Sequence, residues 1–285
     1  MYESEGTEQY TNESIVLPAH TDESGVVRGY VRFAALGDSA TYGVGDRVEG
    51  GWRGWAKILT DSVRDTHDIS FCNLSAPGAT TTDVVETQLP DAVAHRPHVA
   101  ALVVGLNDTM RSSWDIDEVR ENLFRCADEL TLAGALLMTV RFHDHSRVLP
   151  LPKVLAGPMS KRIAALNEVY DEIHQHHGSL RVNLTNVPEI YRRDFWSVDR
   201  LHPSELGHRV LARTFAGMLN DAGLDFTAPE LSCDGTRASR REDLRWLVKE
   251  GAPWVGRRAR DLAPAAINQL RQRLAAGPAV LDMPA

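Results

Sequence analysis

The chain has 285 residues, 43% of them hydrophobic, which is enough for one sizeable core. Its formal net charge of -8 argues against a surface that attracts polyanions, so we expect no nucleic-acid partner. No run approaches the roughly 18 apolar residues of a membrane span, the N-terminal residues are acidic, and three widely spaced cysteines suit a reducing compartment, so the sequence predicts a cytoplasmic protein without a transmembrane segment.

The first 29 residues are polar and acidic and show no periodicity. They predict an irregular N-terminal arm, residues 1–29, in front of a main domain at 30–227. The main domain begins with the apolar run 31–36, which is typical of a buried strand, and this run leads directly into Gly37, Asp38 and Ser39.

Further short apolar runs predict four more strands, at 69–74, 99–104, 135–140 and 180–184. Segments with helical periodicity lie around them, at about 52–65, 81–89, 117–132, 159–176 and 204–221. This alternation predicts an α/β fold with a parallel sheet that is covered by helices on both faces. Ligands of such sheets bind beyond the carboxyl ends of the strands.

A basic C-terminal extension, residues 228–285, follows the main domain. Between 236 and 285 it holds ten lysines and arginines against five acids, and two helices are expected near 240–250 and 259–275. We expect this extension to pack on the acidic domain or on a second subunit of a homo-oligomer. Binding of acidic lipids or nucleic acid is the alternative.

Several polar residues follow the predicted strands directly. Ser39 follows the first strand, Gly78 lies after the second, and Asn107 ends the third. The segment after the last strand contains Asp199 and His202, three residues apart. The parallel topology brings all of these positions to one edge of the sheet.

These residue types match the needs of acyl transfer by a serine. Such chemistry uses a hydroxyl, a base that takes its proton, a group that orients the base, and donors for the oxyanion. Ser39, His202 and Asp199 supply the first three. The backbone N–H groups of Ser39 and Gly78 and the side-chain amide of Asn107 supply an oxyanion hole. Asp38 is expected to cap the turn that presents the nucleophile.

The same residues resemble the motifs of the SGNH, or GDSL-type, hydrolases. The segment Gly37-Asp38-Ser39 resembles the first block of that family, although Ala40 replaces the leucine of the motif. Gly78, Asn107 and the Asp-x-x-His spacing that ends at His202 resemble the other three blocks. The resemblance covers about residues 30–222, and the C-terminal part resembles intracellular actinobacterial members.

This resemblance implies a flavodoxin-like three-layer α/β/α sandwich with a five-stranded parallel sheet. It also implies a serine esterase or lipase-like acylhydrolase that acts on a small-molecule ester of a lipid, a carbohydrate or a small alcohol, without a cofactor. An O-acyltransferase with the same triad remains an alternative, as does a catalytically silent scaffold.

The loop after the fourth strand contains Arg141, His143, Asp144 and His145. Arg141 and His143 are candidates for substrate contact. The His-Asp-His run invites a metal interpretation, but adjacent side chains on an extended backbone point apart, so we expect no metal here.

Overall fold

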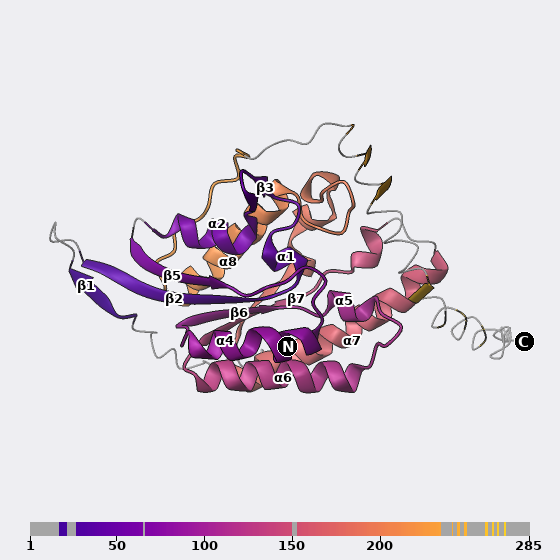
Figure 1. The fold of residues 1–285 in the computed structure, drawn as a ribbon, viewed down its shortest axis with the longest axis horizontal. Helices are drawn as coiled ribbons and strands as arrows, with labels where there is room; N and C mark the ends of the chain where they lie inside the picture. The colour runs from indigo at the N-terminus through magenta and orange to yellow at the C-terminus, as the bar shows by residue number, and fades with distance from the viewer. Residues whose placement is uncertain are drawn as a thin grey trace, which may run out of the picture.

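A sheet of six strands forms the centre of the computed structural model, which describes residues 17–21, 27–64, 66–149 and 153–234 and single residues or pairs between 241 and 271 (Figure 1). The strands are β1 (Ala19–Thr21), β2 (Val27–Gly37), β5 (His67–Asn73), β6 (Val99–Val103), β7 (Leu136–Arg141) and β8 (Leu180–Asn183). Five of them run parallel in the order β5-β2-β6-β7-β8, and β1 pairs antiparallel with the start of β2.

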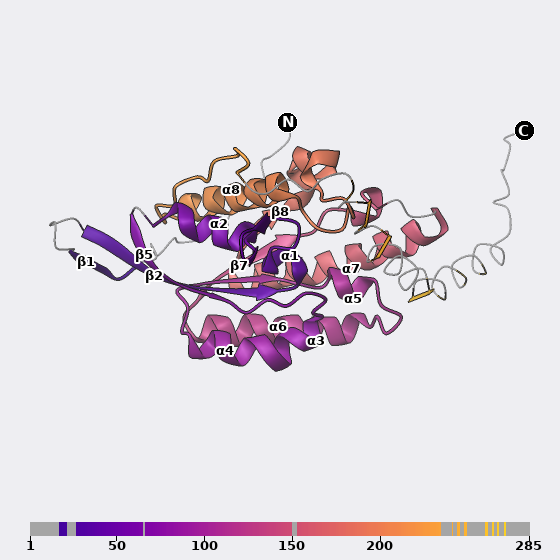
Figure 2. The same cartoon turned by 45° about the horizontal axis from the view of Figure 1, so that its top comes forward.

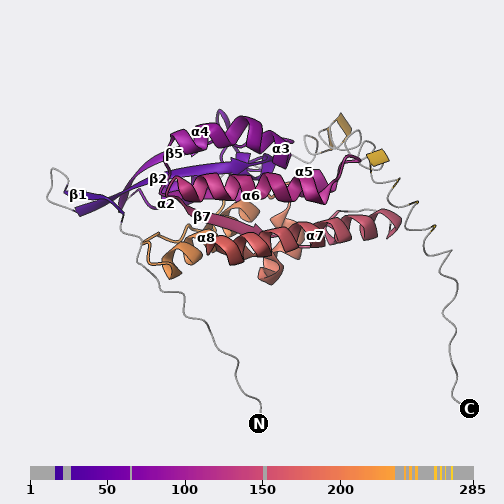
Figure 3. The ribbon, with the colours of Figure 1, turned by 90° about the horizontal axis from the view of Figure 1, so that it is seen from below.

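Helices cover both faces of this sheet (Figures 2 and 3). Helices α2 and α8 lie on one face, and α4, α6 and α7 lie on the other. The helices are α1 (Ser39–Tyr42), α2 (Gly54–Ser62), α3 (Thr81–Asp83), α4 (Leu89–Ala94), α5 (Leu106–Thr109), α6 (Ile116–Leu132), α7 (Lys153–His177) and α8 (Glu205–Asp221). A π-helical stretch, Val84–Gln88, joins α3 to α4, and a small hairpin is formed by β3 (Arg47–Val48) and β4 (Gly51–Trp52).

The central strand β6 is apolar throughout because both of its faces are covered. All five residues of β6 are buried. On the α2 and α8 side, the ring of Trp55 stacks on Phe215 with centroids 4.4 Å apart, and both side chains are 1% exposed. This aromatic pair joins the two helices of that layer.

The predicted five-stranded parallel sheet between helical layers is confirmed. Two details differ from expectation. Part of the expected irregular arm forms β1 and the first residues of β2, because main-chain pairing with Val27–Gly29 organises a segment that has no apolar pattern. In addition, α7 begins at Lys153, six residues before the expected start at about 159, and contains Pro158.

The first residues of the predicted C-terminal extension contact the main domain. Asp234 accepts a hydrogen bond of 2.8 Å from Arg53 on one side and binds Arg209 of α8 on the other. The chain therefore stays on the domain at least to residue 234. Most of the predicted C-terminal helices lie outside the described residues. Among the helices that are described, none combines the length and the hydropathy needed to cross a bilayer.

We predict that Trp55→Ala lowers the free energy of unfolding by about 3–5 kcal/mol, the usual cost of removing a large buried aromatic side chain. Trp52→Ala is the matched control, because Trp52 is 41% exposed and its loss should change stability by no more than about 0.5 kcal/mol. Urea unfolding of both variants measures this difference, and equal losses would show that the α2 and α8 layer does not depend on the aromatic stack.

Candidate active site

Ser39 is the first residue of α1, immediately after β2. Asp38 precedes this helix and its Oδ1 accepts a hydrogen bond of 3.0 Å from the Ala40 N–H, so it caps the turn as expected. The backbone of Gly37 is held on both sides by Gln88, whose side chain accepts from Gly37 N at 2.8 Å and donates to Gly37 O at 2.9 Å. The π-helical stretch brings Gln88 to this position, and the sequence analysis did not identify it.

Ser39, His202 and Asp199 form one continuous hydrogen-bonded series. Ser39 Oγ lies 2.8 Å from His202 Nε2, and His202 Nδ1 lies 2.6 Å from Asp199 Oδ2. The carboxylate fixes the tautomer, with Nδ1–H donating to Asp199 and the lone pair of Nε2 facing the serine hydroxyl. The three side chains thus lie in the order and at the distances that nucleophilic activation of a serine requires.

The loop from Trp196 to Pro203, called here the histidine loop, is built around Asp199. Oδ1 of Asp199 accepts from Ser197 Oγ at 2.5 Å and from the backbone N–H groups of Leu201 and His202 at 2.9 and 3.1 Å. Burial alone would raise the pKa of Asp199, but the hydrogen bond and charge of His202 and the other donors lower it to about 2. The carboxylate is therefore ionised at neutral pH.

The base of the histidine loop rests on a buried histidine pair. Trp196 bridges to Pro203, and its indole packs against the rings of His143 and His145 at centroid distances of 5.2 and 4.8 Å. His143 Nε2 and His145 Nδ1 are 2.8 Å apart, and the two side chains are 3% and 1% exposed. Burial lowers the pKa of both imidazoles, that of His145 to about 4, so the pair is neutral at pH 7.

The structure places the two residues expected to contact substrate, Arg141 and His143, in different surroundings. His143 is enclosed beneath the histidine loop because its neighbours are Trp196 and His145 rather than solvent. Arg141 is ion-paired with Asp171 on α7, which also binds Arg181. Both side chains are thus engaged in packing and pairing, and the sequence of a strand-end loop does not show this.

The three expected oxyanion donors come from three different strand ends. Asn107 lies in α5, and its Nδ2 donates to Ala79 O at 3.0 Å, with a weaker contact of 3.5 Å to Asp38 Oδ2. Gly78 has a φ of 83°, in the left-handed region, and no atom lies within 4 Å of where its β-carbon would be. The carbonyl oxygen of Gly78 accepts a hydrogen bond of 2.9 Å from Arg111. This hydrogen bond ties the loop that contains Gly78 to the residues after α5.

A polar cavity of about 130 Å³ is lined by residues that follow Gly78 and Asn107 in the chain, although neither of these two residues lines it. Its walls come from the start of α3, from α5 and from the start of α6. The lining residues are Thr80, Thr82, Asp108, Arg111, Ser113, Trp114, Asp115, Glu118 and Val119. Arg111 Nε is buried without a hydrogen-bond partner among the described residues, so this wall retains an unused donor.

Comparison with known proteins gives one family and several relatives. The model of the GDSL-like lipase/acylhydrolase family matches residues 35–210. An acetylxylan esterase from Geobacillus stearothermophilus is 25% identical over 198 residues, which cover 63% of this chain and 90% of that protein.

Two solved structures show the same fold at low identity. A crystal structure of the acetylxylan esterase Axe2 from Geobacillus stearothermophilus has a TM-score of 0.55 at 21% identity, covering 68% of this chain and 95% of that one. The psychrotrophic esterase EstA from Pseudoalteromonas sp., inhibited by monoethylphosphonate, has a TM-score of 0.53 at 17% identity, covering 67% and 97%.

Asp38 yields a pH-dependent prediction. Burial raises the pKa of this carboxyl to about 6, above the ordinary value near 3.8, against the lowering effects of the Ala40 N–H and the His202 charge. Between pH 4 and 6 the folded protein therefore holds a proton that the unfolded chain releases. The contribution of Asp38 to stability therefore falls as pH rises through this window, by on the order of 3 kcal/mol. The buried neutral histidines His143, His145 and His208 contribute in the opposite direction over the same range, because the unfolded chain protonates them first.

The variant Asp38→Asn removes this titration and keeps a side chain that can cap the helix. We expect the free energy of unfolding of the wild type, taken relative to that of Asp38→Asn, to fall between pH 4 and 6, because the histidine contribution is the same in both proteins. Urea unfolding at half-unit pH steps measures the difference, and parallel profiles for the two proteins would contradict the assignment.

Proposed function

The chain belongs to the GDSL-like lipase/acylhydrolase family and is a carboxylic ester hydrolase, and from this premise we propose that it acts through an acyl-enzyme on Ser39. The observation that carries the proposal is the hydrogen-bonded series from Ser39 Oγ through His202 to Asp199. A serine hydroxyl alone is a weak nucleophile, and an adjacent neutral imidazole is the usual means of activating it.

In the first step Oγ of Ser39 attacks the ester carbonyl carbon while its proton moves to His202 Nε2. The tetrahedral intermediate then expels the alcohol, which takes this proton from His202 and leaves the acyl group on Oγ. In the second step His202 takes a proton from water as the water oxygen attacks the acyl carbon. The second tetrahedral intermediate then breaks its bond to Oγ, which takes the proton back from His202, and the acid is released. The ionised Asp199 stabilises the imidazolium in both steps.

The oxyanion of both intermediates is assigned to Ser39 N–H, Gly78 N–H and Asn107 Nδ2. The position of Ser39 at the start of α1 supports the first donor, since N–H groups in the first turn of a helix lack intrahelical partners. Asn107 Nδ2 carries two hydrogens, and the 3.5 Å contact to Asp38 leaves one of them weakly engaged and available to substrate.

We propose a short acyl group and a polar alcohol for the substrate. The polar cavity described above has a volume of about 130 Å³ and is lined mostly by hydroxyl, carboxyl and guanidinium groups, with the indole of Trp114 among them. Hydroxyl groups of the alcohol would find hydrogen-bond partners in so polar a space, whereas an apolar alcohol would not. The acetylated substrate named for the Geobacillus relative is in keeping with this preference.

The acyl-enzyme mechanism is tested with p-nitrophenyl esters from acetyl to palmitoyl. We expect Ser39→Ala and His202→Ala to lose hydrolysis and Ser39→Ala to lose labelling by a fluorophosphonate probe. We also expect Asn107→Ala to reduce kcat by about 10²–10³. The matched control is Asn186→Ala, at an exposed position. Hydrolysis that survives in Ser39→Ala would overturn the assignment, and acyl transfer to added alcohols that exceeds hydrolysis would favour an acyltransferase.

The substrate proposal is tested by comparing two acetyl esters on one variant. We expect Trp114→Ala to raise KM for a peracetylated sugar while leaving kcat/KM for p-nitrophenyl acetate close to the wild-type value, because only the sugar reaches the cavity. Trp52→Ala should change neither parameter. Equal losses on both esters would mean that Trp114 supports the site generally and does not contact the alcohol.

A further inference from the structure

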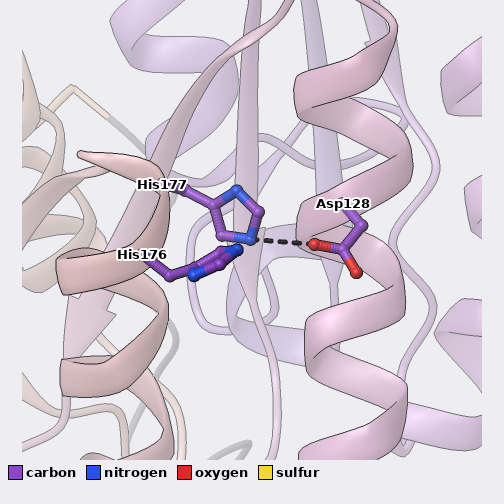
Figure 4. A group of neighbouring side chains, drawn as sticks. All are labelled: Asp128, His176 and His177. Atoms are coloured by element: carbon purple, nitrogen blue, oxygen red, sulfur yellow. Dashed lines mark ion pairs between the residues drawn. The ribbon is translucent and has the colours of Figure 1, made fainter.

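Two histidines and one aspartate, Asp128, His176 and His177, form a cluster of side chains (Figure 4). Asp128 belongs to α6, and His176 and His177 are the last two residues of α7. Each side chain offers one ligand atom, and these three atoms lie within 4.8 Å of one another. Asp128 and His176 are exposed, whereas only 9% of the His177 side chain is accessible.

His177 and Asp128 contact each other directly. His177 Nε2 lies 3.0 Å from Asp128 Oδ1, yet this buried nitrogen has no hydrogen-bond partner of acceptable geometry among the described residues. Two ligands of one zinc ion at 2.0–2.1 Å in tetrahedral geometry lie about 3.3 Å from each other. The separation of these two atoms therefore suits a shared ion.

The end of α7 allows consecutive histidines to converge. Adjacent side chains inside a helix point in directions about 100° apart. Here the helix ends at His177, Gly178 adopts a left-handed φ of 61°, and His174 Nδ1 lies 2.6 Å from Ser179 O and holds the following turn. Phe124 on α6 packs near both rings, with centroids 6.2 Å from His176 and 6.4 Å from His177.

The electrostatic setting also favours a cation. The carbonyl groups at the C-terminus of a helix carry partial negative charge, and the Asp128 carboxylate adds a full one. Two imidazole nitrogens and one carboxylate oxygen form a donor set that suits zinc and similar transition metals better than magnesium or calcium.

We propose that Asp128, His176 and His177 bind one transition metal ion of the zinc type, with water completing its coordination. The ion would join the C-terminal ends of α6 and α7. These ends lead into β7 and β8 and so lie at the amino-terminal edge of the sheet, opposite the edge where Ser39 lies. The site therefore acts on stability and takes no part in ester hydrolysis.

Zinc titration of EDTA-treated full-length protein by isothermal calorimetry tests the proposal, with thermal unfolding as a second measurement. We expect one ion to bind and to raise Tm. Asp128→Asn and His176→Ala should weaken binding by about tenfold or more, since even changes around metal ligands cost 10–100-fold in affinity. Both substitutions are at exposed positions and should leave the fold and the p-nitrophenyl ester activity unchanged.

Glu129→Gln is the matched control, because it makes the same kind of change one residue away, on a carboxylate that pairs with Arg125. It should bind zinc as the wild type does and show the same rise in Tm. The proposal would be overturned if the wild type did not bind zinc. It would also be overturned if Asp128→Asn and His176→Ala bound zinc as tightly as the wild type and Glu129→Gln. Either result would leave the assignment of Ser39 untouched, because that is tested without metal.

Discussion

The backbone of Gly37 passes so close to the neighbouring strand that a β-carbon there would lie 2.4 Å from the carbonyl oxygen of Val103. This approach sets the end of β2 against the end of β6, where Gly37 and Val103 are register partners. Gln88 holds the same peptide from the opposite side. With Gly37 fixed, Asp38 can cap α1 and Ser39 lies beyond the edge of the sheet. The position of the nucleophile therefore depends on the close approach of the Gly37 and Val103 backbones, which only a glycine at residue 37 allows.

A second set of contacts joins the segment after Ser39 to the segment that carries His202. A β-carbon on Gly45 would lie 1.9 Å from the Pro203 carbonyl oxygen, so these two backbones touch. His208 of α8 accepts from Trp55 N–H at 3.2 Å through Nδ1 and lies 3.1 Å from Val44 O through Nε2. Burial lowers the pKa of His208 to about 4, so its imidazole is neutral at pH 7. In this form it joins α8, the helix that follows the histidine loop, to the backbone of Val44 and Trp55. The 2.8 Å separation of Ser39 and His202 thus rests on backbone contacts more than 150 residues apart in sequence.

Much of this arrangement could be predicted because its signals are local. The strands are continuous apolar runs, the helices are periodic, and the reactive residues follow strand ends, so topology alone brings them to one edge. What could not be predicted depends on contacts distant in sequence. Gln88 reaches Gly37 only through a π-helical turn, and β1 exists only by pairing with β2. His143 follows a strand end as a ligand-binding residue would, yet the packing of Trp196 encloses it.

Asp199 accepts four hydrogen bonds, one from the His202 imidazole and three from within its own loop. The loop is closed by the bridge between Trp196 and Pro203 and by the Ser197 N–H, which donates to His202 O at 2.9 Å. The acid and the base of the triad therefore lie in one short loop that is stabilised by its own hydrogen bonds, and only the serine comes from another part of the chain. For protein engineering, this means that the whole stretch from Trp196 to Pro203 has to be grafted together, since the aspartate shapes the backbone that carries the histidine.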